Sequence, residues 1–139
     1  MRVLLTIIGC LFIVVTASAR DPMGFDSIRL PEGYKFTHDR GTDSYVGRIH
    51  KDGGLTITTD SGAGAGELVR LQDRSTYRWF RQIQIGGHLA YLAMHRNPDK
   101  KILMLTYQRT PVNFKAEIHS DADIAEFIAI LSTYELPDK

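Results

Sequence analysis

The pattern of apolar and polar positions along the chain predicts a sheet built from hairpins. Short runs rich in β-branched and aromatic residues alternate with turns rich in glycine and proline, as expected for strands. Two pairs of runs are joined by Asp52-Gly53-Gly54 and by Gly86-Gly87, which are strong hairpin signals. We expect strands near residues 25–30, 34–38, 45–51, 55–60, 77–85, 88–95, 101–108 and 113–119.

The end of the chain predicts an amphipathic helix. Ser120 and Asp123 have the spacing of a capping box, in which each side chain accepts a hydrogen bond from the other residue's backbone N–H. After this cap, apolar residues recur at helical spacing and form one stripe, at Ile124, Phe127, Ile128, Leu131 and Tyr134. Pro137 then prevents the helix from continuing.

Two of the expected strands, Leu89 to Met94 and Ile102 to Tyr107, are apolar on both faces. Such strands lie in the middle of a sheet whose two sides are both covered. The final helix is the expected cover on one side. The segment Glu67 to Arg74, which is compatible with about two helical turns, is the candidate on the other, together with nearby loops. The chain is therefore predicted to be an α+β domain: an antiparallel β-meander of about six or seven strands covered by a C-terminal helix.

Residues 1–19 have the pattern of a secretory signal peptide. A basic start at Arg2 precedes the apolar run Val3 to Val15 and a small-residue cleavage site, Ala17-Ser18-Ala19. An uncleaved membrane anchor is the alternative, although the run is shorter than the roughly 20 apolar residues that a spanning helix needs. Export to a periplasm or to the outside is the prediction, with residues 20–24 as a lead-in and 25–139 as one domain.

Cys10 allows another interpretation of this front end. The run Ile7-Ile8-Gly9-Cys10 loosely resembles a lipoprotein cleavage box. The apolar run continues through Leu11 to Val15, however, where a polar tether should begin. Removal with the leader would leave a domain without cysteine, and therefore without a disulfide, a thiolate nucleophile or a thiolate-bound metal.

The charge balance argues against two classes of partner. Cleavage after Ala19 removes one basic residue, Arg2, and leaves 16 Lys and Arg against 16 Asp and Glu. Nucleic-acid binders carry an excess of basic residues that neutralises phosphates, and proteins of the membrane surface carry polybasic patches. We therefore expect no nucleic acid and, after signal cleavage, no stable membrane insertion. An unknown protein or envelope component, or a small ligand, remains as the expected partner.

Several motifs resemble a known sequence pattern. The chain contains Leu30-Pro31-Glu32-Gly33-Tyr34, Val46-Gly47-Arg48-Ile49 and Gly53-Gly54-Leu55-Thr56-Ile57. Together they resemble small exported bacterial proteins of unknown function. The first motif and the final helix also resemble, faintly, the PsbP-like sandwich of an antiparallel sheet with helical cover. These resemblances imply an accessory or binding role rather than catalysis.

The most plausible contact surface is the glycine-rich connection after the fourth expected strand. It lacks the third glycine of a dinucleotide fingerprint, because Glu67 stands there, and it lacks the Lys-Ser/Thr pair of a P-loop. We therefore expect no nucleotide cofactor. The residues proposed to contact a ligand or partner are Asp60, Gly62, Gly64, Gly66, Arg70 and Trp79.

The alternative hypothesis is an envelope hydrolase or metal-dependent enzyme that uses His50, Asp60 or His88. The chain has no nucleophile elbow of the form G-x-S-x-G and no H-x-x-x-H or H-E-x-x-H spacing. Surface or strand-end histidines are the simpler interpretation, and no metal is expected. The favoured hypothesis is an exported, non-catalytic binding or accessory protein.

Overall fold

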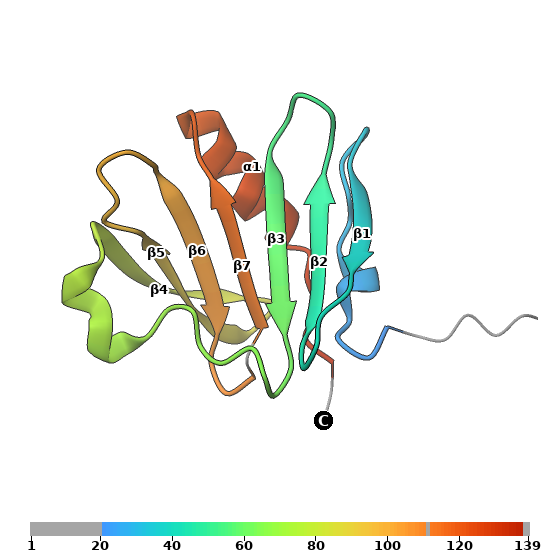
Figure 1. The fold of residues 1–139 in the computed structure, drawn as a ribbon, viewed down its shortest axis with the longest axis horizontal. Helices are drawn as coiled ribbons and strands as arrows, with labels where there is room; N and C mark the ends of the chain where they lie inside the picture. The colour runs from blue at the N-terminus through green and yellow to red at the C-terminus, as the bar shows by residue number, and fades with distance from the viewer. Residues whose placement is uncertain (1–20, 111, 138–139) are drawn as a thin grey trace, which may run out of the picture.

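In the described parts of the chain, seven strands form a single antiparallel sheet, and one α-helix lies on one of its faces (Figure 1). The computed structural model describes residues 21–110 and 112–137; the predicted signal peptide and Cys10 lie outside these residues. The α+β fold, with an antiparallel sheet and a C-terminal helix, is confirmed. The elements are η1 (Phe25–Ser27), β1 (Lys35–Asp39), β2 (Tyr45–His50), β3 (Thr56–Ser61), η2 (Leu71–Thr76), β4 (Trp79–Ile85), β5 (His88–Met94), β6 (Ile102–Tyr107), β7 (Val112–Glu117) and α1 (Asp121–Leu131).

The sheet consists of two meanders rather than one. Its strand order is β1-β2-β3-β7-β6-β5-β4, so the first three strands and the last four are each sequential. The two halves join where β7 pairs with β3, in a register that places Thr59 opposite Phe114 and Asp60 opposite Asn113. The chain must therefore cross from β3, in the middle of the sheet, to β4 at its edge. We call this connection, residues 62–78, the crossover.

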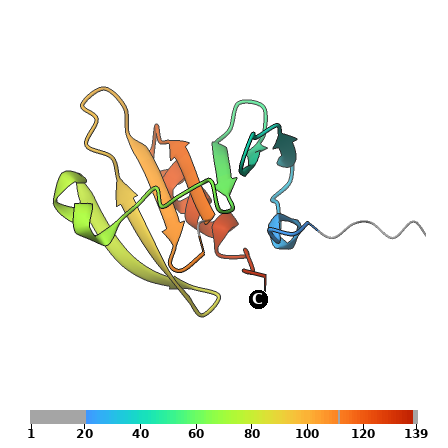
Figure 2. The same ribbon diagram turned by 60° about the horizontal axis from the view of Figure 1, so that its bottom comes forward.

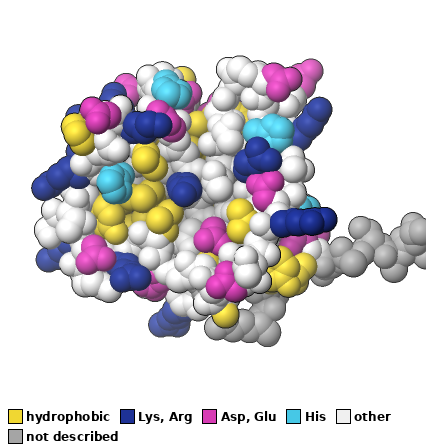
Figure 3. Space-filling model, viewed as in Figure 1, with side chains coloured by type: hydrophobic (Ala, Val, Ile, Leu, Met, Phe, Trp, Pro, Cys, Tyr) yellow, Lys and Arg dark blue, Asp and Glu magenta, His cyan; other side chains and the backbone are white. Residues whose placement is uncertain are grey.

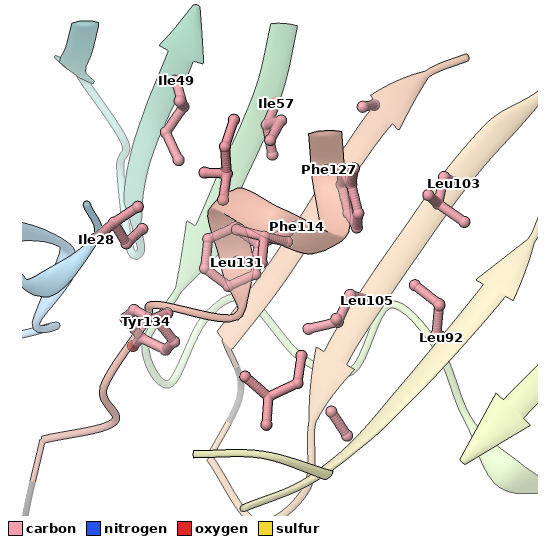
Figure 4. Close-up of a cluster of buried hydrophobic side chains, with 14 of the residues drawn as sticks. Ile28, Ile49, Ile57, Leu92, Leu103, Leu105, Phe114, Phe127, Leu131 and Tyr134 are labelled. Atoms are coloured by element: carbon pink, nitrogen blue, oxygen red, sulfur yellow. The ribbon is translucent and has the colours of Figure 1, made fainter. Parts of the chain in front are cut away.

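The face that carries α1, here the inner face, holds the main core. Phe127, Ile130 and Leu131 of the helix are almost fully buried against the sheet, whereas Ile128, predicted to share their stripe, is 39% exposed. Figure 4 shows Phe127 and Leu131 of the helix in a cluster with strand residues such as Phe114. Helix and sheet bury their apolar sides against each other, which provides the main hydrophobic stabilisation of the fold.

The start of α1 has the predicted capping box. The Ser120 hydroxyl accepts a hydrogen bond from the Asp123 N–H, and the Asp123 carboxylate accepts from the Ser120 N–H at 3.0 Å. The carboxylate also accepts from the N–H of His119 at 2.7 Å. These backbone N–H groups stabilise the charged carboxylate and lower the pKa of Asp123. The stability that they contribute is therefore present at neutral pH and lost as the pH falls through this lowered pKa.

The opposite, outer face has a smaller apolar cluster beneath the crossover. Val69 and Tyr77 of the crossover pack on Tyr91, Ala93 and Met104 of β5 and β6. Figure 2 shows the crossover passing in front of β7 and β6 on its way to η2. Both faces of β5 and β6 are therefore covered, as the apolar residues on both faces of these strands predicted.

The predicted first strand at 25–30 is wrong. Phe25 begins a 3-10 turn that packs its ring into the inner core, and Ile28 follows three residues later on the same side. A spacing of three suits a helical turn better than a strand. Two hydrogen bonds join this segment to the residues that follow α1. Tyr134 Oη donates to the Met23 carbonyl, and Arg29 N–H donates to Thr133 Oγ1.

The predicted helical turns at 67–74 are also misplaced. Residue 70 has extended dihedral angles, and a 3-10 helix forms only from Leu71 to Thr76. The N–H groups of Leu68 and Val69 donate to side chains of the sheet instead of to carbonyls within a helix. Tertiary hydrogen bonds therefore override the local helical preference in this segment.

Candidate functional site

Two buried polar side chains on the outer face fasten the crossover to the sheet. Thr106 of β6 and Asn113 of β7 lie opposite each other, and the Thr106 hydroxyl donates to Asn113 Oδ1 at 2.7 Å. Asn113 Oδ1 also accepts from Leu68 N at 3.0 Å, and Thr106 Oγ1 accepts from Val69 N at 2.9 Å. Asn113 Nδ2 donates to the Gly66 carbonyl at 2.9 Å. These hydrogen bonds fix the position of the crossover on the outer face of the sheet.

A cavity of about 320 Å³ lies where the crossover spans the outer face of β3 and β7. Figure 3 looks onto this face: hydrophobic side chains gather over β5 and β6, and charged side chains of both signs lie over β3 and β7. We call it the crossover cavity. It is lined by Thr58, Asp60, Ala65, Glu67, Leu68, Arg70, Asp73, Asn113, Phe114 and Lys115.

The crossover cavity carries a formal charge of −1, because three carboxylates and two basic side chains line it. None of the ion pairs within the described parts of the chain involves Asp60, Arg70 or Lys115. Asp60 Oδ1 is buried and accepts no hydrogen bond from the described residues. A buried acceptor without a donor costs about 1–3 kcal/mol. Because the Asp60 side chain is only partly buried and lines the cavity, this carboxylate is the strongest sign of a ligand there.

The structure brings together only some of the predicted contact residues. Asp60 and Arg70 both line the crossover cavity, and the Gly66 carbonyl helps to fix its wall. Gly62 and Gly64 belong to the turn that leaves β3, where Gly62 has a φ of 105° that favours glycine and Gly64 packs closely on Asp43.

Trp79 lies apart from the other predicted contact residues. It stands opposite Met94 and packs, half-buried, against the inner core, on the other side of the sheet from the cavity. Arg70 and Trp79 therefore cannot contribute to the same small-molecule site.

The residues of the enzyme hypothesis are also far apart. His50 pairs with Thr56, four positions before Asp60 on β3, which corresponds to roughly 13 Å along the strand. His88 lies on β5, three strands away from β3, or roughly 14 Å across the sheet. General acid–base groups act within hydrogen-bond reach, directly or through one water, and this separation exceeds both.

His50 has a structural partner instead. Its Nε2 lies 2.9 Å from the Thr37 hydroxyl on the neighbouring strand. Across residues 21–110 and 112–137, no three His, Cys, Asp or Glu side chains gather closely enough to hold a metal ion. The same residues contain no helix long and apolar enough to span a bilayer.

Sequence reasoning missed Thr58, Asn113 and Lys115, which line the cavity, and Thr106, which fastens the crossover beside it. One signal was present, because Thr106 is a polar residue within the apolar run Ile102 to Tyr107. A polar side chain at a buried strand position needs a partner, which points to a hydrogen bond on that face. The identity of the partner depends on the β6–β7 register and on the path of the crossover, which local patterns do not encode.

The comparisons with known proteins give no relative from which to transfer a function: no family model, no curated protein and no solved structure matches this chain. The function therefore has to be argued from the cavity itself.

Substituting Asn113 with Ala should destabilise the protein by at least about 2 kcal/mol. The change leaves Leu68 N–H, the Thr106 hydroxyl and the Gly66 carbonyl without their partner, and each such group costs about 1–3 kcal/mol when it stays buried. Thr58→Ala changes the same face at a hydroxyl that makes no hydrogen bond with the described residues, so it should cost less than about 1 kcal/mol. Urea unfolding measures both values, and equal losses would contradict a fastening role for Asn113.

Proposed function

We propose that this protein is an exported, non-catalytic binding domain that holds a small amine-bearing molecule in the crossover cavity. The observation that carries the proposal is Asp60, a partly exposed carboxylate on the cavity wall that forms no ion pair with the described residues and whose Oδ1 accepts no hydrogen bond from them. A ligand N–H donor would bind at the accessible side of this carboxylate, and a charged donor would form the stronger, charge-assisted bond.

The charge of the cavity favours a cationic donor over a neutral one. Asp60, Glu67 and Asp73 outnumber Arg70 and Lys115, so a bound ammonium group reduces a net negative charge instead of adding to a positive one. A carboxylate or phosphate would meet three carboxylates at close range. A ligand that also carries a hydroxyl or carboxylate could place it toward the two basic side chains.

The size and lining of the cavity favour a small ligand. A volume of about 320 Å³ is at the lower end of the range for small-molecule sites, roughly 300–1,000 Å³. Ala65 and Leu68 offer apolar contact for the carbon part of the ligand, and Thr58 offers a hydroxyl. This combination suits a molecule with the dimensions of an amino alcohol or an amino acid.

The non-catalytic part of the proposal is supported by the wide spacing of His50, Asp60 and His88. Export is supported by the sequence of residues 1–19, with its apolar run and its Ala17-Ser18-Ala19 cleavage site.

Ethanolamine should raise the thermal midpoint of the protein, because it carries both an ammonium group and a hydroxyl. Choline, which has the same charge but no N–H donor, should raise it much less, and acetate should leave it unchanged. At a ligand concentration 100 times Kd, binding to the folded state adds about 2.7 kcal/mol of stability. Differential scanning fluorimetry with all three compounds makes this comparison.

Asp60→Asn should abolish the ethanolamine effect, because it removes the charge and keeps the side-chain shape. The matched control is Asp99→Asn, which neutralises an exposed carboxylate in the turn between β5 and β6. A response to ethanolamine that survives Asp60→Asn, or equal responses to ethanolamine and acetate, would rule out this site.

The exported form should begin at Arg20. Cleavage after Ala19 removes the basic start and the whole apolar run. Edman sequencing of protein recovered from the periplasm or medium of an expressing bacterium gives the first residue, and a cytoplasmic protein that retains Met1 would contradict export.

A further inference from the structure

The backbone of β4 forms one edge of the sheet. β4 is the last strand in the sheet order, and within residues 21–110 and 112–137 the only strand that pairs with it is β5. The Phe80 carbonyl accepts a hydrogen bond from the guanidinium of Arg81 at 2.9 Å, so it points away from β5. Because peptide groups in an antiparallel pair alternate in direction, those of Gln82 and Gln84 also point outward. An unpaired edge of this kind can accept another strand.

The hairpin that forms this edge and the residues that flank it carry arginines but no acidic side chain. Residues 74–96 contain four arginines and no Asp or Glu, giving a formal charge of +4, whereas the rest of the chain carries −3. All four arginine residues are exposed. Three lie near the start of β4. Arg78 immediately precedes the strand, Arg74 lies in the last turn of the 3-10 helix before it, and Arg96 Nη2 donates to the Tyr77 carbonyl at 3.4 Å.

We propose that the β4 edge binds an extended acidic segment of a partner protein as an eighth strand. The backbone of β4 would supply the pairing, and the arginines would select for acidic side chains. A second copy of this chain fits poorly, since two β4 edges side by side would bring together two copies of residues 74–96, each with a charge of +4.

The side chains of β4 indicate the pattern of the partner strand. On the inner face, Trp79 and Ile83 are half-buried, and Arg81 between them is exposed. A partner strand that lies beside β4 would place apolar residues next to Trp79 and Ile83 and an acidic residue next to Arg81.

The other edge of the sheet, β1, has only five residues, and its Asp39 is paired with Arg48. The β4 site is therefore the more suitable edge for an acidic strand.

The site is independent of the crossover cavity, so the two proposals can fail separately. The probe is a fluorescein-labelled seven-residue peptide, Glu-Val-Thr-Glu-Thr-Val-Glu, matched in length to β4. Its second, fourth and sixth residues share one face of a strand, so valine, glutamate and valine can lie next to Ile83, Arg81 and Trp79. Fluorescence anisotropy should detect its binding to the full chain, and the same peptide with lysine in place of glutamate should not bind. Hydrogen exchange at the amides of Gln82 and Gln84 should slow when the acidic peptide is present.

Two pairs of variants separate backbone pairing from charge. Gln82→Pro removes an outward N–H, and proline is tolerated on edge strands, so binding should weaken roughly tenfold while Gln82→Ala binds like the native protein. Arg78→Gln with Arg81→Gln should also weaken binding roughly tenfold. Arg29→Gln with Lys35→Gln, an equal charge change near the opposite edge, should not.

Three results would overturn the proposal. The first is a native protein that does not bind the acidic peptide. The second is equal binding by Gln82→Pro and Gln82→Ala, which would mean that only charge attracts the peptide. The third is a sulfated oligosaccharide that binds as tightly as the peptide and depends on the same arginines, since this would assign the edge to polyanions without strand pairing.

Discussion

Three hydrogen bonds join the crossover to β6 and β7, and the path of the chain over the outer face of the sheet depends on them. Asn113 and Thr106 provide the acceptors for Leu68 N and Val69 N, and Asn113 Nδ2 donates to the Gly66 carbonyl. They direct a chain segment that would otherwise be a loose connection across the outer face. The segment buries the second apolar cluster, encloses the crossover cavity and delivers the chain to the edge where β4 begins.

The two proposed binding sites use opposite features of this arrangement. The crossover cavity is a small, net acidic space in which a buried Asp60 oxygen lacks a donor. The β4 edge is long, open and basic, with arginines and outward peptide groups. A domain with both could hold a small amine on one side of the crossover and an acidic partner strand on the other, as an accessory protein in the envelope would. The crossover leads from the cavity wall directly into β4, so it is also the physical link between the two sites.

The parts of the fold that local chemistry determines could be predicted, and the parts that depend on distant pairing could not. The Gly86-Gly87 turn and the Ser120 capping box act within a few residues and are present as expected. The pairing of β3 with β7 joins residues more than 50 positions apart, and no local pattern specifies it. The same limit affected the candidate site. Asp60 and Arg70 were predicted together, but the face occupied by Trp79 and the contribution of Asn113 depend on the assembled sheet.

Hydrogen exchange of the native protein tests the central claim most directly. If Asn113 and Thr106 fasten the crossover, the amides of Leu68 and Val69 should exchange as slowly as amides of β6 and β7, although these residues belong to no strand or helix. The amide of Ala63, in the exposed turn of the same connection, should exchange much faster. If Leu68 and Val69 exchange as fast as Ala63, the crossover is not fixed to the sheet, and neither the cavity nor its proposed ligand can be argued from these contacts.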